Sequence, residues 1–224
     1  MFYKENLKNA LLLPDFDSIS AQNKMVPNPR ASVRPPEKEG DPNKSSVMLI
    51  IYNKDNNLNL LLIRRQENLK THPGQISFPG GTHEDKETFL ETALRETHEE
   101  VGIVPNNLEV LGKLNPVYIP PSDFVVYPFV SWHNRQPVCT PCHDEVAEII
   151  EVPIKELLNN GSKSSEIRIN KGAEITIPYF RIKEHKVWGA TAMILSELLE
   201  RFKSASTKDQ LSSLSYCLAK PETS

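Results

Sequence analysis

The segment ENLKTHPGQISFPGGTHEDKETFLETALRETHEEVGI, residues 67–103, begins as a turn-rich stretch and ends as a strongly acidic one. Its second half has apolar or small residues at helical spacing: Leu90, Ala93, Leu94, Thr97 and Val101. We predict a helix over this half, with Asp85 as its N-cap and Gly102 as its C-terminal stop. Such a helix would hold a dense group of carboxylates directly after the glycine pair at 80–81.

Three carboxylates crowd one side of this predicted helix. Glu96 and Glu100 are four residues apart and Glu99 is three from Glu96, so all three project together. Like charges at this spacing cost an isolated helix about 0.2–0.5 kcal/mol per pair, and the helix dipole disfavours them in the last turn. A solvated charged face is the usual explanation, but such faces normally alternate acids with lysines. A hard divalent cation, Mg²⁺ or Mn²⁺, would turn the repulsion into a binding site and would implicate a phosphorylated substrate.

The spacing of these residues resembles the Nudix box, in which a glycine is followed by five residues, a glutamate, seven residues and an Arg-Glu pair. Seven fixed positions agree: Gly81, Glu87, Arg95, Glu96, Glu99, Glu100 and Gly102. At roughly 5% per residue type, chance agreement at one start point is on the order of 10⁻⁹. Thr97 departs from the pattern, because the family usually has an aliphatic residue there, and we expect this to affect packing rather than chemistry.

The resemblance implies an α/β/α sandwich with a mixed sheet, over roughly residues 46–203, in which the box forms a loop-helix-loop. It also implies hydrolysis of a diphosphate linked to a nucleoside and another group. The implied roles are metal ligand for Glu96, Glu100 and Glu99, support of the metal cluster for Glu87, and a carboxylate partner for Arg95. Glu99 has a second implied role, that of a base acting through metal-bound water.

The segment before the box, residues 61–81, resembles the extra motif of the coenzyme A diphosphatase branch of Nudix enzymes. Eight positions match in register: Leu61, Leu62, Arg65, Gly74, Phe78, Pro79, Gly80 and Gly81. Lys70 stands where the branch has arginine, and Ile63 and Gln66 depart from its usual threonine and small residue. The segments PPSDFVVYPFV and VWGATAMIL also resemble this branch.

The residues of this motif are suited to binding phosphate groups beside the predicted carboxylate helix. Coenzyme A carries a diphosphate and a ribose 3′-phosphate, and Arg65 and Lys70 offer cations to them, although lysine loses the bidentate contact of arginine. Gly80 and Gly81 would let the backbone approach the diphosphate closely. Arg64 we interpret as a residue that only flanks the end of a strand.

One further carboxylate lies outside the box. In CHDEVAEIIEVP, Glu145 comes just before a predicted strand, and many Nudix enzymes supply an extra carboxylate from a loop in this part of the fold. Two interpretations stay open, a base or extra metal ligand on the one hand and a surface acid on the other. Asp144 beside it provides a control.

The rest of the chain predicts a sheet between helical layers. Strands are expected in a hairpin over 47–65, at 75–81, 107–120, 124–132 and 145–153, and in a late hairpin over 166–180. Short or long helices are expected near the N-terminus, after Pro153 and over 188–203. We divide the chain into an N-terminal helix with a proline-rich linker or arm (1–45), a Nudix domain (46–205) and a tail (206–224).

Composition narrows the partners and the compartment. The 224 residues include 26 basic and 29 acidic ones, a net charge of −3 with no basic stripe, so we expect no nucleic-acid duplex as partner. No segment approaches the roughly 20 apolar residues of a membrane helix. The three cysteines, Cys139, Cys142 and Cys217, favour a reducing compartment, which we take as the cytoplasm. Cys139 and Cys142 we interpret as loop cysteines, because a zinc site would need a second pair of ligands.

Alternative functions remain open at this point. One is a Nudix hydrolase of different specificity, for ADP-ribose, a dinucleotide or a nucleoside triphosphate. A second is a non-catalytic Nudix-fold module that only binds nucleotide, although every carboxylate of the box is present. The sequence does not determine the oligomeric state, and a homodimer is one open alternative.

Overall fold

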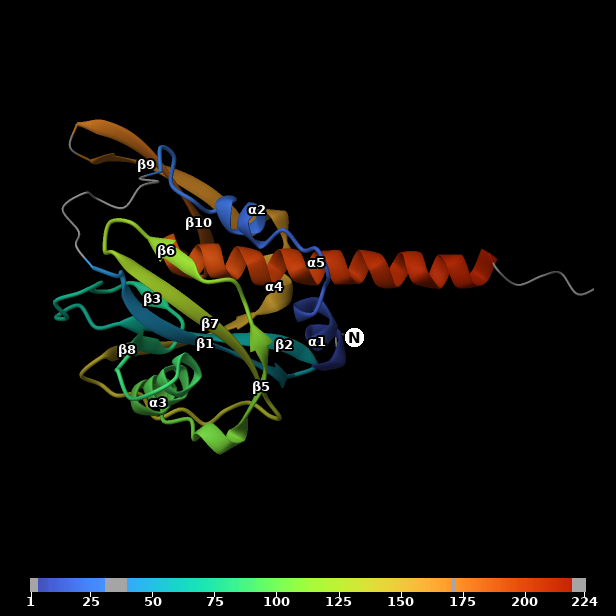
Figure 1. Ribbon diagram of the computed structural model, residues 1–224, viewed down its shortest axis with the longest axis horizontal. Helices are drawn as coiled ribbons and strands as arrows, with labels where there is room; N and C mark the ends of the chain where they lie inside the picture. The colour runs from blue at the N-terminus through green and yellow to red at the C-terminus, as the bar shows by residue number, and fades with distance from the viewer. Residues whose placement is uncertain (1–3, 31–39, 171, 219–224) are drawn as a thin grey trace, which may run out of the picture.

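A mixed β-sheet forms the centre of the computed structural model, which describes residues 4–30, 40–170 and 172–218 (Figure 1). The strands of this sheet are β1 (Asn43–Lys54), β2 (Asn57–Arg65), β3 (Ile76–Ser77), β4 (Gly80–Thr82), β5 (Leu108–Lys113), β6 (Val117–Ile119), β7 (Phe124–His133) and β8 (Val146–Pro153). The central order is β3-β2-β1-β7-β5, with β4 beside β1, β6 beside β7 and β8 beside β2. Strands β1 and β7 run parallel while β1 and β2 run antiparallel, so the predicted mixed sheet is confirmed.

Each face of the sheet is covered by one long helix, α3 (Phe89–Val101) below and α5 (Gly189–Leu218) above in Figure 1. Strand β1 supplies both cores in alternation, because Met48 and Ile50 pack on the α3 side and Leu49 and Ile51 on the α5 side. A strand buried on both faces reads as a continuous apolar run. The α/β/α sandwich predicted from the box is therefore confirmed.

The two predicted hairpins are also present. Strands β1 and β2 are joined at Asp55 and Asn56, whose φ angles of 49° and 58° fit the tight turn that Asp and Asn favour. After the short helix α4 (Ile154–Leu158), strands β9 (Lys163–Asn170), β10 (Ala173–Ile182) and β11 (His185–Val187) form a separate three-stranded sheet.

The start of α3 corrects the sequence prediction. The N-cap is Thr88 and not Asp85: the Thr88 side chain accepts a hydrogen bond from the Glu91 N–H at 3.3 Å, and Glu91 Oε2 accepts one from the Thr88 N–H at 2.7 Å. The T-x-x-E sequence thus forms a capping box, which satisfies two backbone donors at once. The predicted stop is confirmed, since Gly102 adopts a left-handed conformation at φ 73°.

The N-terminal segment is more closely integrated than a linker or arm would be. Helices α1 (Lys4–Leu11) and α2 (Ser18–Asn23) lie against α5 (Figure 1). The prediction of a linker or arm is wrong at Met25, which is 1% exposed within the main hydrophobic cluster. Residues 31–39 of the predicted linker lie outside the described residues.

A buried polar group on α5 explains this integration. Glu197, which is fully buried, accepts hydrogen bonds from Gln22 Nε2 at 2.8 Å and from Arg201 Nε at 3.0 Å. Arg201 also donates to Ser18 Oγ at 3.0 Å and to the Leu11 carbonyl at 3.2 Å. Charges buried in this way are stable only when each one is paired, so α5 holds the N-terminal helices through a shared ion pair.

Helix α5 is longer than predicted. The expected helix covered residues 188–203, whereas α5 continues to Leu218 without a break at 205, so the boundary between domain and tail stays a prediction. None of the helices in the described ranges combines the length and the apolar character needed to cross a membrane.

Candidate active site

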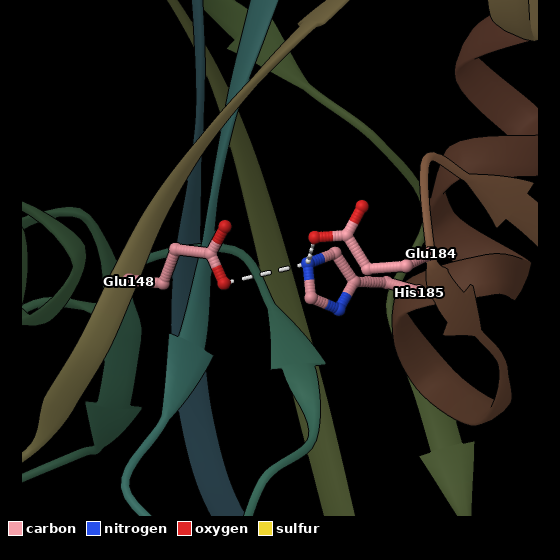
Figure 2. Close-up of side chains that lie close together, drawn as sticks. All are labelled: Glu148, Glu184 and His185. Carbon is pink, nitrogen blue, oxygen red and sulfur yellow. Dashed lines mark ion pairs between the residues drawn. The ribbon is translucent and has the colours of Figure 1, made fainter.

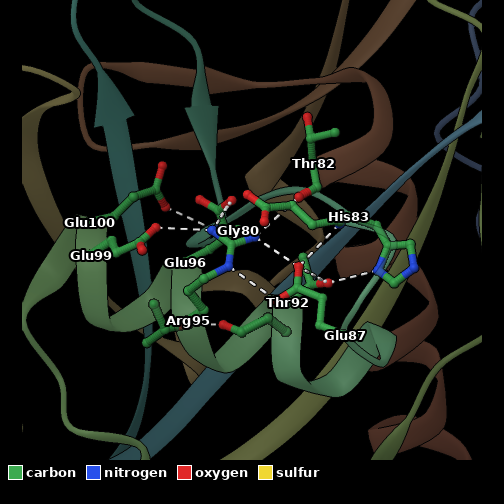
Figure 3. Close-up of polar contacts among 12 residues, drawn as sticks. Gly80, Thr82, His83, Glu87, Thr92, Arg95, Glu96, Glu99 and Glu100 are labelled. Atoms are coloured by element: carbon green, nitrogen blue, oxygen red, sulfur yellow. Dashed lines mark hydrogen bonds and ion pairs between the residues drawn. The ribbon is translucent and has the colours of Figure 1, made fainter.

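Arg95 lies at the centre of the α3 carboxylates (Figure 3). Its Nη1 donates to Glu96 Oε1 at 2.8 Å and to Glu99 Oε2 at 3.0 Å. Its Nε and Nη2 donate to the two oxygens of Glu87 at 3.1 and 2.9 Å, and Nη2 also reaches the Thr82 carbonyl at 3.2 Å. One guanidinium therefore donates hydrogen bonds to three box carboxylates, whose combined charge exceeds its own, and ties α3 to β4. The expected pairing of Arg95 with a carboxylate is thus present in the geometry.

Glu87 is held in its ionised form by its neighbours. The hydrogen bonds from Arg95, with a further one from Thr92 Oγ1 at 2.7 Å, lower the pKa of Glu87 to about 2. Thr92 Oγ1 is also 2.9 Å from His83 Nδ1. The loop before α3 is therefore fixed to the first turns of the helix through Glu87.

Glu100 is the most buried member of the cluster, with 1% of its surface exposed. Its Oε2 accepts a hydrogen bond from the Gly80 N–H at 2.8 Å, and its Oε1 lies 3.4 Å from Arg65 Nη1. Burial, together with the nearby charges of Glu96 and Glu145, raises the pKa of Glu100 to about 8 in spite of these two contacts. A cation beside this carboxylate would favour the ionised form.

The glycine pair allows these carboxylates to lie directly on strand β4. A Cβ at Gly81 would come within 2.4 Å of Glu96 Oε1, and a Cβ at Gly80 would come within 2.2 Å of the Ser46 carbonyl oxygen. Gly80 also has a φ of 153°, which other residues rarely adopt. Burial likewise raises the pKa of Glu96. The close approach that the sequence predicted for a diphosphate is made here by the carboxylates themselves.

Thr97, the departure from the box pattern, is fully buried as predicted. Its hydroxyl donates to the Ala93 carbonyl at 2.7 Å, within α3. The hydroxyl is thus satisfied inside the helix, so the substitution leaves the carboxylate face unchanged.

The two arginines at the end of β2 have different partners. Arg65 faces Glu100, and its Nε is buried with no hydrogen-bond partner among the described residues. Arg64 pairs instead with Glu148 at 3.2 Å and with Glu67 at 3.4 Å. Consecutive strand residues project to opposite faces, which agrees with the interpretation of Arg64 as a residue that flanks the strand end.

Lys70 lies apart from this group. It is exposed in the turn-rich segment between β2 and β3, and within the described ranges no hydrogen bond or ion pair ties its ammonium to the carboxylates.

Glu145 lies near the box although it is distant in sequence. It is exposed in the turn before β8, and its negative charge contributes to raising the pKa of both Glu96 and Glu100. The fold therefore brings Glu145 within electrostatic range of the α3 carboxylates.

A second group of ligand-type side chains was not singled out by the sequence (Figure 2). His185 Nε2 lies 3.4 Å from Glu148 Oε2 and 3.4 Å from Glu184 Oε1. Arg64 Nε lies 3.2 Å from the same Glu148 oxygen, so this group already contains its own cationic partner. We regard it as an ion-pair cluster that joins β8 to the three-stranded sheet. Glu148 is 36 residues before Glu184 and 37 before His185 in the sequence, so no local pattern joins the three.

The predicted loop cysteines are found in a loop. Cys139 and Cys142 are both free thiols in the irregular segment before β8. Burial raises the pKa of the Cys139 thiol to about 11, which keeps it in the unreactive protonated form.

A mixed sheet between two helical layers, with a crowded carboxylate helix set against a glycine pair, defines the class of protein. The chain belongs to the Nudix family, because the model of the NUDIX domain matches residues 42–170, more than half of its length. It is a Nudix hydrolase, an enzyme that acts on diphosphate bonds, and Nudix hydrolases generally use divalent metal ions.

Comparisons with individual proteins agree. The uncharacterized Nudix hydrolase NudL of Photorhabdus laumondii is 32% identical over 174 residues, covering 75% of this chain and 89% of the relative. Nudix hydrolase 3 of Caenorhabditis elegans is 31% identical over 172 residues, covering 69% and 71%. The solved structure of the Nudix hydrolase RenU from M. smegmatis aligns with a TM-score of 0.50 at 13% identity, covering 76% of this chain and 89% of that one. The structural likeness supports the fold alone.

Proposed function

We propose that this Nudix hydrolase cleaves the diphosphate bond of coenzyme A or one of its derivatives. Water adds to one phosphorus and the bridging P–O bond breaks, which gives a 4′-phosphopantetheine product and adenosine 3′,5′-bisphosphate. The proposal rests on the motif at residues 61–81. The observation that carries it is Arg65, whose partly buried guanidinium lies beside Glu100 and whose Nε has no hydrogen-bond partner in the part of the chain that the structure describes. A buried donor without a partner is costly, and a phosphate oxygen would satisfy it.

The cation in this proposal is Mg²⁺ or Mn²⁺, held by the carboxylates of α3. Glu96 and Glu100 are the main ligands, Glu99 is a further one, and Glu87 supports the cluster. The donor chemistry fits such an ion, because all donors are carboxylate oxygens and because Glu100 is buried with a raised pKa that a bound cation would reverse. Arg95, which pairs with Glu96 and Glu99 in this structure, would have to release them to the ion. A bound ion would neutralise phosphate charge and activate water.

The chain itself binds and orients the substrate. Arg65 and Lys70 hold the anionic part of the nucleotide. Gly80 and Gly81 belong to the substrate site on the strength of the motif, since Ser46 and Glu96 fill the space beside them in this structure. Arg95 fixes the carboxylates in position and does not contact the substrate. Glu145 accepts the proton of the attacking water or acts as an extra ligand, and Glu99 is the alternative base.

The proposal also includes a cellular compartment and a binding partner. The odd, low cysteine count supports a reducing compartment such as the cytoplasm, and the substrate partner is a small-molecule nucleotide. Every side chain in the proposal comes from one chain, so the proposal requires no homodimer.

A panel of diphosphates tests the substrate assignment. Coenzyme A, ADP-ribose, a dinucleoside polyphosphate and a nucleoside triphosphate are each incubated with the enzyme and Mg²⁺, and initial rates are compared. Coenzyme A is expected to be turned over fastest. A much faster turnover of ADP-ribose would replace the substrate assignment and leave the Nudix chemistry intact.

A further inference from the structure

Gln66 connects the end of strand β2 to the turn that carries Glu145. Its backbone N–H donates to the Glu145 carbonyl at 2.9 Å, and its side-chain Nε2 donates to the His143 carbonyl at 2.8 Å. One of these bonds comes from the backbone and the other from the side chain, and together they attach the turn to the residue that follows β2. Gln66 therefore holds two carbonyls of the segment from which the Glu145 side chain projects.

The other end of the same segment is fixed to the C-terminal end of helix α3. The Cys142 N–H donates to the Glu100 carbonyl at 2.9 Å, and the Thr140 N–H donates to the Val101 carbonyl at 2.9 Å. These bonds satisfy two of the carbonyls that a helix C-terminus leaves unpaired. Between the two ends, the Glu145 N–H donates to the Cys142 carbonyl at 3.0 Å. The turn is thus held between α3 and β2.

We propose that Gln66 is a positioning residue for Glu145, so that the amide of Gln66 sets where the Glu145 carboxylate lies relative to Glu96 and Glu100. This inference rests on the role of Glu145 in the proposed function. The Glu145 side chain is exposed, so the position of its carboxylate depends largely on the backbone of the turn. Because reactions are sensitive to small displacements of the reacting groups, a bond to the turn affects the chemical step. A small residue at position 66, which the related branch motif usually has, would keep the backbone bond and lose the side-chain bond.

The variant Gln66→Met tests this directly, because methionine has nearly the same length and lacks the amide donor. We expect kcat to fall about 3- to 10-fold, the effect of one neutral hydrogen bond, with KM unchanged. The matched control is Gln136→Met, since Gln136 Nε2 donates a comparable bond of 2.9 Å to Glu151, and its kcat should stay at the wild-type value. Rates are measured with coenzyme A and with ADP-ribose at saturating Mg²⁺.

A double variant separates positioning from a general structural effect. If Gln66 acts through Glu145, then Gln66→Met should lower kcat in the wild-type background and change it less than about twofold in the Glu145→Gln background, because coupled residues are not additive. An equal loss in both backgrounds, or no loss in either, would overturn the inference.

Hydrogen exchange gives a readout that does not depend on activity. In the metal-free protein, peptides covering residues 143–146 should exchange faster in Gln66→Met than in the wild type or in Gln136→Met. Unchanged exchange there would contradict the connection. A wild-type kcat for Glu145→Gln would remove the role of Glu145 from the proposed function, and this inference with it. Loss of kcat in Glu145→Gln alone would contradict only the role of Gln66.

Discussion

Arg65 on strand β2 faces Glu100 on helix α3, with Nη1 3.4 Å from Oε1, while the Nε of the same guanidinium is buried without a hydrogen-bond partner in residues 4–30, 40–170 and 172–218. An arginine proposed to hold phosphate therefore lies beside the carboxylate proposed to hold the cation. The two roles are adjacent because β2 and α3 pack against each other through the core on that face of the sheet.

The variant Arg65→Lys tests the phosphate role of this pair. Lysine keeps the charge and loses the planar donor group, and a hydrogen bond to a charged group contributes about 1.5–3 kcal/mol. We expect kcat/KM for coenzyme A to fall roughly 10- to 100-fold, mostly through KM. Arg64→Lys is the control, and steady-state kinetics should show less than a threefold change for it. Equal losses in both variants would contradict the assignment.

The variant Glu100→Gln should lose most activity and remain folded. Burial of the Glu100 carboxyl at neutral pH costs the uptake of a proton, and glutamine needs none, so the metal-free variant should be at least as stable as the wild type. Near-normal turnover at saturating Mg²⁺ would remove Glu100 from the ligand set.

The Glu100 carboxyl also predicts a pH dependence of the stability of the wild type, which Glu100→Gln should lack. In the folded protein the pKa of Glu100 is about 8 against an ordinary value of 4.5, so between these values the folded state binds a proton that the unfolded state has lost. The free energy of unfolding in EDTA should therefore fall as pH rises from 5 to 8, by at most about 1.4 kcal/mol per unit from this group. Urea unfolding at pH 5.5 and 8 checks this. The free energy of unfolding of the wild type, minus that of Glu100→Gln, should be more negative at pH 8 than at pH 5.5. A difference that does not change with pH would contradict the burial argument.

The glycine at position 81 gives a steric prediction. The variant Gly81→Ala would place a Cβ within 2.4 Å of Glu96, so the Glu96 carboxylate must move. We expect a loss of kcat of at least 10-fold with a smaller effect on stability. Gly112→Ala is the control, because the nearest atom to its Cβ is 3.4 Å away, in Leu11. Kinetics and thermal melts of both variants would show whether the loss is confined to Gly81.

The buried ion pair on α5 predicts a stability effect far from the chemistry. The variant Glu197→Leu leaves Arg201 buried without its partner, which typically costs about 3–5 kcal/mol. The variant Glu200→Leu removes ion pairs with the partly exposed Lys24, Lys163 and Lys203, whose ammonium groups water can still solvate, and should cost about 0–1 kcal/mol. Urea unfolding measures both, and kcat should be unchanged wherever each variant is folded. A small loss in Glu197→Leu would mean that the N-terminal helices do not depend on this pair.

The parts of the fold that the sequence predicted are those specified locally. The α3 helix, its glycine stop and the β1–β2 hairpin follow from periodicity and turn chemistry within a dozen residues. The N-cap was misplaced because the acid at Asp85 lies outside the capping box that Thr88 and Glu91 form.

The parts that the sequence did not predict depend on distant partners. Gln22 meets Glu197 across 175 positions, so nothing in residues 1–30 indicated that they join the core. In the site, the box carboxylates could be named from their spacing, but the location of Arg95 among three of them and the connection from Gln66 to Glu145 depend on packing. The carboxylate at Glu145 was identified only as one of two open interpretations, because no local pattern specifies which loop comes near α3.

The central claim is hydrolysis of coenzyme A, and product identification tests it most directly. The enzyme is incubated with coenzyme A and Mg²⁺, and the products are separated and identified by mass spectrometry. The account predicts equal amounts of 4′-phosphopantetheine and adenosine 3′,5′-bisphosphate, with no products from Glu100→Gln under the same conditions. Intact coenzyme A after prolonged incubation, alongside rapid turnover of ADP-ribose, would contradict it.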